Sequence, residues 1–205
     1  MTIQPSRDAT ASLLVLASVF HFLLAAVAVQ FLRPGYDPWQ APLSLYLSGE
    51  WGAWLRCAYY GLALGVAVLA VQVHRSLLPA ARHVLVPVLL VIGAAALAVT
   101  AMWPGPAPGY PVDELGVLVH RISAMSAFLL VGSGMLLQSA TLRHDPRWRA
   151  TGRILLPLAM LAFAGLWAHA LWRELPRGAS QKAVIALYLA WLGLCAWQLR
   201  AGTRR

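Results

Sequence analysis

Six long apolar runs dominate the sequence and limit the folds that it can adopt. They cover approximately residues 10–32, 52–73, 84–103, 116–138, 154–172 and 183–199. A run of ~18 or more apolar residues can cross the hydrocarbon core as a helix, which satisfies its own backbone hydrogen bonds. The composition agrees, because 60% of the residues are hydrophobic and only 11% are charged. The sequence therefore predicts an all-α fold, a polytopic integral membrane six-helix bundle, with residues 1–205 forming a single transmembrane domain.

The first apolar run has a second interpretation as a secretory signal peptide. Ala26-Val27-Ala28 would supply the small residues of a cleavage site. Against this, Asp8 offsets Arg7 in the short segment before the run, and the run continues to Leu32. We therefore expect the first run to be a retained span.

The basic residues predict an orientation. Excess Lys and Arg mark cytoplasmic segments, and an N-terminus inside the cell places ten of the 16 basic residues there. These ten are Arg7, Arg75, Arg82, Arg143, Arg147, Arg149, Arg153, Arg200, Arg204 and Arg205. The net charge of +9 then reflects topology, so we expect both termini in the cytoplasm, the lipid bilayer as the partner, and no nucleic acid.

The connection between the first two spans has an unusual pattern. Residues 33–50 begin with three prolines, Pro34, Pro38 and Pro42, which prevent a continuous helix. Leu43-Ser-Leu-Tyr-Leu-Ser48 follows and is apolar but too short to span. We expect this segment to lie on, or dip back into, the outer leaflet.

Polar residues at the start of the fourth span need different explanations. Asp113 and Glu114 fall in the first turn, where acidic side chains complement the helix dipole. His120 and Arg121 lie deeper, and ionisable groups inside a membrane usually face the bundle interior and need partners. The pair is therefore the strongest functional signal in the sequence.

Three further residues lie at the same expected depth as this pair. Arg56 opens the second span, Glu50 precedes it, and His169 lies near the outer end of the fifth span. Together they predict a polar pocket open to the outer face, formed by the tops of spans two, four and five beneath residues 33–50. The alternative is a set of structural ion pairs that closes the bundle.

Metal and haem binding are weaker interpretations of these residues. Asp113, His120 and His169 could supply zinc ligands, and the two histidines could ligate haem. The sequence has no His-x-x-x-His or Cys-x-x-Cys spacing, so we predict no metal and no cofactor.

A family resemblance rests on short motifs. They are Leu43-Ser-Leu-Tyr-Leu-Ser-Gly-Glu-Trp-Gly-Ala-Trp-Leu-Arg56, then Tyr60-Gly-Leu-Ala-Leu64, then Tyr110-Pro-Val-Asp113 with His120. Over about residues 10–200 the sequence resembles a bacterial membrane family, domain of unknown function 998, which is distantly similar to the six-span FRAG, DRAM and Sfk group. The resemblance implies a bacterial inner-membrane location, recurrent polar positions at Ser44, Asp113 and His120, and a mild preference for a lipid-like ligand.

Three functions remain open. The first is binding of a small anionic or lipid head-group ligand through Arg56, Arg121 and His120, since guanidinium groups suit phosphate and carboxylate. The second is a membrane-embedded lipid hydrolase or acyltransferase that uses Ser44 or Ser48 with His120 and Asp113. The third is a structural or accessory subunit in which the charges only fix helix register.

Overall fold

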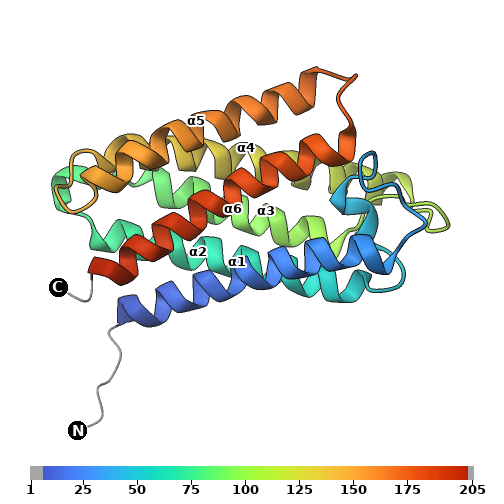
Figure 1. The fold of residues 1–205 in the computed structure, drawn as a ribbon, viewed down its shortest axis with the longest axis horizontal. Coiled ribbons are helices and arrows are strands. Elements are labelled where there is room, and N and C mark those ends of the chain that lie inside the picture. The colour runs from blue at the N-terminus through green and yellow to red at the C-terminus, as the bar shows by residue number, and fades with distance from the viewer. Residues whose placement is uncertain (1–6, 203–205) are drawn as a thin grey trace, which may run out of the picture.

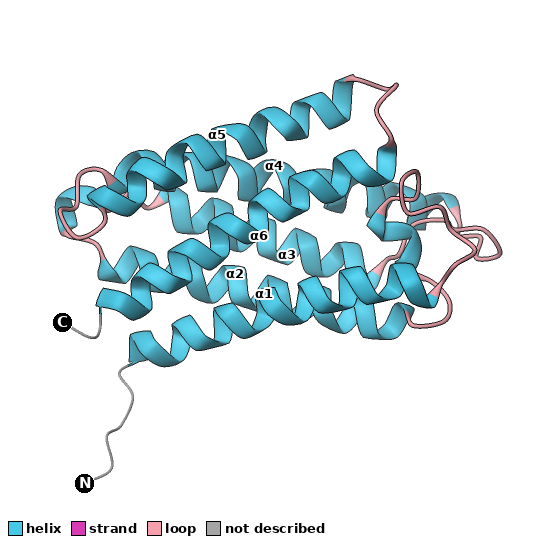
Figure 2. Cartoon of the chain, in the orientation of Figure 1, coloured by secondary structure: helices cyan, strands magenta, loops and turns pink. Residues whose placement is uncertain are grey.

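The computed structural model describes residues 7–202, and within that range it contains six long helices, two short 3-10 helices and no β-strand (Figure 2). The long helices are α1 (Arg7–Leu32), α2 (Gly52–Ser76), α3 (Leu85–Met102), α4 (Glu114–Leu142), α5 (Arg149–Leu171) and α6 (Arg177–Gly202). The short ones are η1 (Leu43–Leu47) and η2 (Pro79–Ala81). Each of the six long helices in this range is long and apolar enough to cross a membrane. The predicted all-α, multi-pass membrane fold is confirmed.

The helices form a closed ring in chain order. Each helix packs on its neighbours in sequence, α1 packs on α6, and α2 also reaches α6 across the ring. All six run roughly parallel to the long axis of the molecule (Figure 1). The start of α1, the end of α6 and the connections 77–84 and 143–148 lie at one end, which we call the terminal end. Residues 33–51, 103–113 and 172–176 lie at the opposite end, which we call the loop end. Arg204 and Arg205 lie outside the described residues.

Small residues allow the helices to approach closely. A Cβ atom on Gly93 of α3 would come within 2.7 Å of Val131 on α4, and one on Gly134 of α4 would come within 2.7 Å of Leu90 on α3. Hydrogen bonds between helices add to this packing, such as that from Trp191 Nε1 to Ser139 Oγ at 2.9 Å. Helix association in lipid depends on close packing and such bonds, because lipid chains are as apolar as the bundle interior.

At the terminal end, Asp145 joins two connections. Its carboxylate is fully buried and accepts hydrogen bonds from the Leu78 backbone N–H at 2.9 Å and from the Arg147 backbone N–H at 2.9 Å. The Arg147 guanidinium lies 3.1 Å from the same carboxylate and also donates to the Ser76 carbonyl. One buried acidic side chain therefore links the two connections at this end of the bundle.

At the loop end, residues 33–51, here called the lid, fold over the bundle. The three apolar side chains Leu43, Tyr46 and Leu47 of η1 are at most 1% exposed and pack among α1, α2 and α6. These side chains are thus directed at the protein, and the position of the segment on, or dipping into, the outer leaflet stays a prediction. The first turn of α6 holds the lid through the Ala179 N–H, which donates to the Trp39 carbonyl at 2.9 Å.

Candidate functional site

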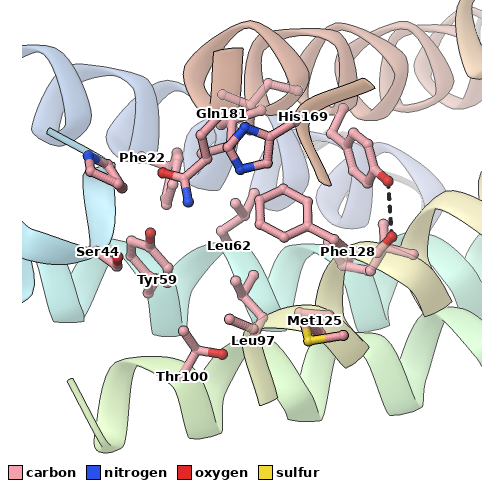
Figure 3. Close-up of a pocket in the computed structure, with 18 of the residues that line it drawn as sticks. Phe22, Ser44, Tyr59, Leu62, Leu97, Thr100, Met125, Phe128, His169 and Gln181 are labelled. Carbon is pink, nitrogen blue, oxygen red and sulfur yellow. Dashed lines mark hydrogen bonds between the residues drawn. The ribbon is translucent and has the colours of Figure 1, made fainter. Parts of the chain in front are cut away.

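A cavity of about 610 Å³ lies inside the ring and extends from the loop end toward the middle of the bundle. Its volume falls within the range of about 300–1,000 Å³ typical of small-molecule sites. All six long helices contribute to its wall, and α1 does so through Phe22 (Figure 3). In Figure 3, His169 and Gln181 lie on one side of the cavity, opposite Leu97, Thr100 and Met125.

Polar side chains line the part of the cavity nearest the loop end, and we call this part the polar end. These side chains are Ser44, His120, Arg121, His169, Arg177 and Gln181. Ser44 belongs to η1, and the other five lie near the loop-end limits of α4, α5 and α6. Gln181 links this group to the lid, since its Oε1 accepts a hydrogen bond from the Leu43 N–H at 2.8 Å.

His120 is fixed by the loop between α3 and α4. Its Nδ1 lies 2.8 Å from the carbonyl oxygen of Trp103. A carbonyl oxygen only accepts, so Nδ1 must hold the proton and donate it. Gly105 lies against the ring, where a Cβ atom would come within 2.7 Å of Cδ2. The same Cβ atom would come within 3.0 Å of Nε2, the ring nitrogen that has no hydrogen bond to a described group.

The hydrogen bonds of His169 also define which of its ring nitrogens carries the proton. Ser180 Oγ donates to the Pro176 carbonyl at 2.7 Å, so its single proton is used there and it must accept from His169 Nδ1 at 2.8 Å. Nε2 of the same ring then accepts from Arg177 Nη2 at 3.2 Å. His169 therefore orients Arg177 and, in this arrangement, cannot act as the base for Ser180.

The polar end has fixed positive charge. Arg121 and Arg177 both line the cavity, and no Asp or Glu is among the lining residues. The ion pair between Arg147 and Asp145 lies far away at the terminal end. The Arg121 guanidinium has no hydrogen bond to any described group. Two guanidinium groups without a carboxylate partner favour an anion at this place.

Apart from Tyr59, Thr100 and Tyr188, the rest of the cavity is lined by apolar side chains. Its wall continues toward the middle of the bundle through six residues from five helices: Phe22, Leu62, Val66, Leu97, Val131 and Leu192. Tyr188 also lines this part, but its hydroxyl group donates to the Phe128 carbonyl at 2.8 Å, the contact dashed in Figure 3. The cavity therefore has one basic end and a long hydrophobic body.

The structure brings only part of the predicted site together. Ser44, His120, Arg121 and His169 line the cavity, whereas Arg56, Glu50, Ser48 and Asp113 are not among its lining residues. Arg56 donates instead to the Leu47 carbonyl at 3.4 Å and supports the lid. Glu50 is exposed in the lid, and Ser48 is buried there, with its carbonyl accepting from Arg33.

Asp113 belongs to the helix start. Its Oδ1 accepts from the Gly116 N–H at 2.8 Å, which is the N-cap contact of α4. His120 Nδ1 is directed at Trp103, so among the described residues no hydrogen bond links Asp113, His120 and Ser44. The triad that a hydrolase of this kind needs is not assembled in this conformation.

Two residues of the polar end were not in the predicted site. Arg177 and Gln181 lie four positions apart, hence on one face of α6. We expected the sixth span to begin near residue 183, which left both in a connection. Their spacing just ahead of the apolar run was the available signal.

Ligands for a metal are not gathered at the cavity. Within residues 7–202, no group of three His, Cys, Asp or Glu side chains is arranged to hold a metal ion. His120 and His169 use their Nδ1 atoms for contacts with Trp103 and Ser180. The polar end is suited to charge recognition through its arginines.

The fold and the membrane-spanning helices define a multi-pass membrane protein with an internal cavity. The family model described as "Protein of unknown function (DUF998)" matches residues 15–198, so the chain belongs to that family. This match confirms the family resemblance that the motifs around Ser44 and His120 indicated. No curated protein matches the chain, and no solved structure matches it.

Proposed function

We propose that this protein binds an anionic amphiphile, with the acidic head at the polar end and the hydrocarbon chain in the apolar body of the cavity. The observation that supports this most directly is the division of one continuous cavity of about 610 Å³ into a basic end and a hydrophobic body. A small hydrophilic anion would leave the apolar body unused. A neutral apolar molecule would leave two arginines without a counterion.

The head group would be held by charge-assisted hydrogen bonds. Arg121 has an unengaged guanidinium, and Arg177 is oriented by His169. Ser44 and His120 line the same wall, where the Ser44 hydroxyl can donate a further hydrogen bond, whereas His120 Nε2, unprotonated when Nδ1 donates, can accept one from a P–O–H group. Phosphate and carboxylate groups match this set, because arginine presents paired donors in a planar fork.

The orientation and location belong to the same proposal. The connections and helix ends at the terminal end contain Arg75, Arg82, Arg143, Arg147 and Arg149, which favours the cytoplasmic side for that end. The loop end, with its lid and the polar end of the cavity, would then face outward in a bacterial inner membrane. The ligand would therefore come from the outer leaflet or from the space beyond it.

Binding of hexadecyl phosphate tests the proposal. The purified protein in neutral-lipid nanodiscs is titrated with hexadecyl phosphate, hexadecanol and inorganic phosphate, and the dissociation constants are compared. We expect hexadecyl phosphate to bind tightest. Replacing Arg121→Gln or Arg177→Gln should weaken it about 10- to 150-fold, since a hydrogen bond to a charged group contributes about 1.5–3 kcal/mol. Hexadecanol binding should change little.

Arg173→Gln is the matched control, because Arg173 is exposed at the same end and does not line the cavity. Equal weakening by all three substitutions would mean that a general surface charge attracts the ligand, and would refute the assigned site. Equal binding of inorganic phosphate and hexadecyl phosphate would show that the apolar body has no part in recognition. Equal binding of hexadecanol and hexadecyl phosphate would remove the role of the arginines.

A further inference from the structure

The contact between α4 and α5 changes along the length of the bundle. In the middle it is closed, because a Cβ atom on Gly132 of α4 would come within 3.1 Å of Phe163 on α5 and would also meet the Tyr188 hydroxyl of α6. Residues seven and eleven positions earlier in α4 share that helix face. They are Met125, which is 63% exposed, and Arg121, which is also exposed.

The facing side of α5 becomes uncovered at the same level. Phe163 meets Gly132, and the following positions on its face are Trp167, 45% exposed, and Leu171, 73% exposed. Because α4 and α5 run in opposite directions, Met125 and Leu171 lie at a similar distance from this contact. The two helices therefore separate toward the loop end. In Figure 1 the turn between α5 and α6 lies apart from the cluster formed by the other loops of this end.

This separation opens the cavity sideways. Arg121 and Met125 are exposed on the outside of the bundle and also line the cavity, so the wall is incomplete between α4 and α5. We call this place the side opening: Arg121 and Met125 of α4 also line the cavity, whereas Trp167 and Leu171 of α5 form its outer edge and do not line the cavity. Arg121 lies seven residues into α4, about 10 Å from its start, and Met125 lies deeper. His120 contacts the carbonyl of Trp103, just past the end of α3, so Arg121 is level with the helix ends and Met125 lies about one turn nearer the middle of the bundle.

In contrast to the side opening, the loop end of the cavity is covered by the lid. Leu43 and Leu47 of the lid are at most 1% exposed, and the lid is bonded to α6 through Ala179 and Gln181. The loop between α3 and α4 also packs on the lid, because a Cβ atom on Gly49 would come within 2.6 Å of the Tyr110 ring. Access from the aqueous side would require these contacts to break.

We propose that the ligand is a membrane lipid that enters the cavity from the bilayer through the side opening between α4 and α5. This inference rests on the proposed amphiphile binding and specifies its source. The rim is apolar at Met125, Trp167 and Leu171 and basic at Arg121 nearest the loop end. A lipid in the leaflet has the same order, with its chain in hydrocarbon and its acidic head toward water. Its chain can pass between the helices without crossing water.

A reversible lock on the side opening tests this route. In a Cys57→Ser, Cys195→Ala background, Met125→Cys and Leu171→Cys are joined with a cleavable bis-maleimide. A second protein has the lid locked instead, through Trp39→Cys and Ala179→Cys, whose backbones are bonded at 2.9 Å. Both are placed in phosphatidylcholine vesicles with a hexadecyl phosphate that carries a mid-chain diazirine. After illumination, labelling of peptides containing Leu62 or Phe128 is measured by mass spectrometry.

We expect locking the side opening to reduce this labelling at least tenfold, and cleavage of the linker to restore it. Locking the lid should leave labelling within twofold of the unlocked protein. Loss of labelling only in the lid-locked protein would overturn the proposal in favour of aqueous entry. Unchanged labelling in both locked proteins would also overturn it. If the unlocked protein is not labelled above a diazirine-containing hexadecanol control, the proposed anionic amphiphile binding itself fails.

Discussion

Replacing Asp145 by asparagine should destabilise the bundle, because this side chain fastens the terminal end. Its carboxylate is 0% exposed, and each oxygen accepts from one backbone N–H, Leu78 for Oδ2 and Arg147 for Oδ1, both at 2.9 Å. Asparagine has one carbonyl oxygen, so its NH₂ group would face one of these donors. A hydrogen bond to a charged group contributes about 1.5–3 kcal/mol, and the loss of one sets the expected cost. The Arg147 ion pair adds at most about 1 kcal/mol, since that side chain is 60% exposed and its charge is screened.

Asp37→Asn provides the matched control. Asp37 Oδ1 accepts from the N–H two residues later, Trp39 N, at 2.9 Å, as Asp145 Oδ1 does from Arg147 N. Asp37 is exposed, so its replacement should cost below about 0.5 kcal/mol. The free energy of unfolding is measured by titrating the detergent-solubilised protein with sodium dodecyl sulfate and following tryptophan fluorescence. Equal costs for Asp145→Asn and Asp37→Asn would refute the role assigned to Asp145.

The same substitution should remove a pH dependence. Burial by itself raises the pKa of the Asp145 carboxyl, but the hydrogen bonds from the Arg147 side chain and from the Leu78 and Arg147 N–H groups outweigh it and hold the pKa below its ordinary range. A lowered pKa in the folded state contributes stability above the ordinary value of about 4, and this stability is lost as the pH falls through the folded-state pKa. The difference between wild type and Asp145→Asn should therefore shrink below about pH 4. A constant difference from pH 7 to pH 3 would contradict this account.

Three other changes test packing and ligand recognition. Gly132→Ala should cost about 1–3 kcal/mol because its Cβ would meet Phe163 at 3.1 Å, whereas Gly193→Ala, with nothing within 4 Å, should be neutral or stabilising in the same unfolding assay. Trp191→Phe should cost about 1–3 kcal/mol through the lost bond to Ser139 and the volume removed from a fully buried site, which chemical unfolding also measures. Shortening hexadecyl to tetradecyl phosphate should weaken binding about 15-fold, at about 0.8 kcal/mol per methylene, and equal dissociation constants would contradict burial of the chain.

The membrane fold could be predicted from the sequence because one physical constraint decides it. A backbone in hydrocarbon must satisfy its own hydrogen bonds, so each long apolar run has to be helical. The helix ends were less predictable, as α6 shows. It begins at Arg177, and its first turns contain Arg177, Gln181 and Lys182, which a search for apolar runs assigns to a connection. These turns contact the lid and the cavity, so their polar side chains have partners that hydropathy does not consider.

The candidate site was partly predictable for a related reason. Position along a span gives the depth of a residue, and depth was enough to group His120, Arg121 and His169. It also placed Arg56 with them, although Arg56 is directed at the Leu47 carbonyl beneath the lid. The direction in which a side chain points depends on the rotation of its helix about its own axis. In a soluble protein the apolar stripe of each helix reveals that rotation. In a membrane bundle both faces are apolar, so the sequence contains little of this information, and only helix packing separates Arg121 from Arg56.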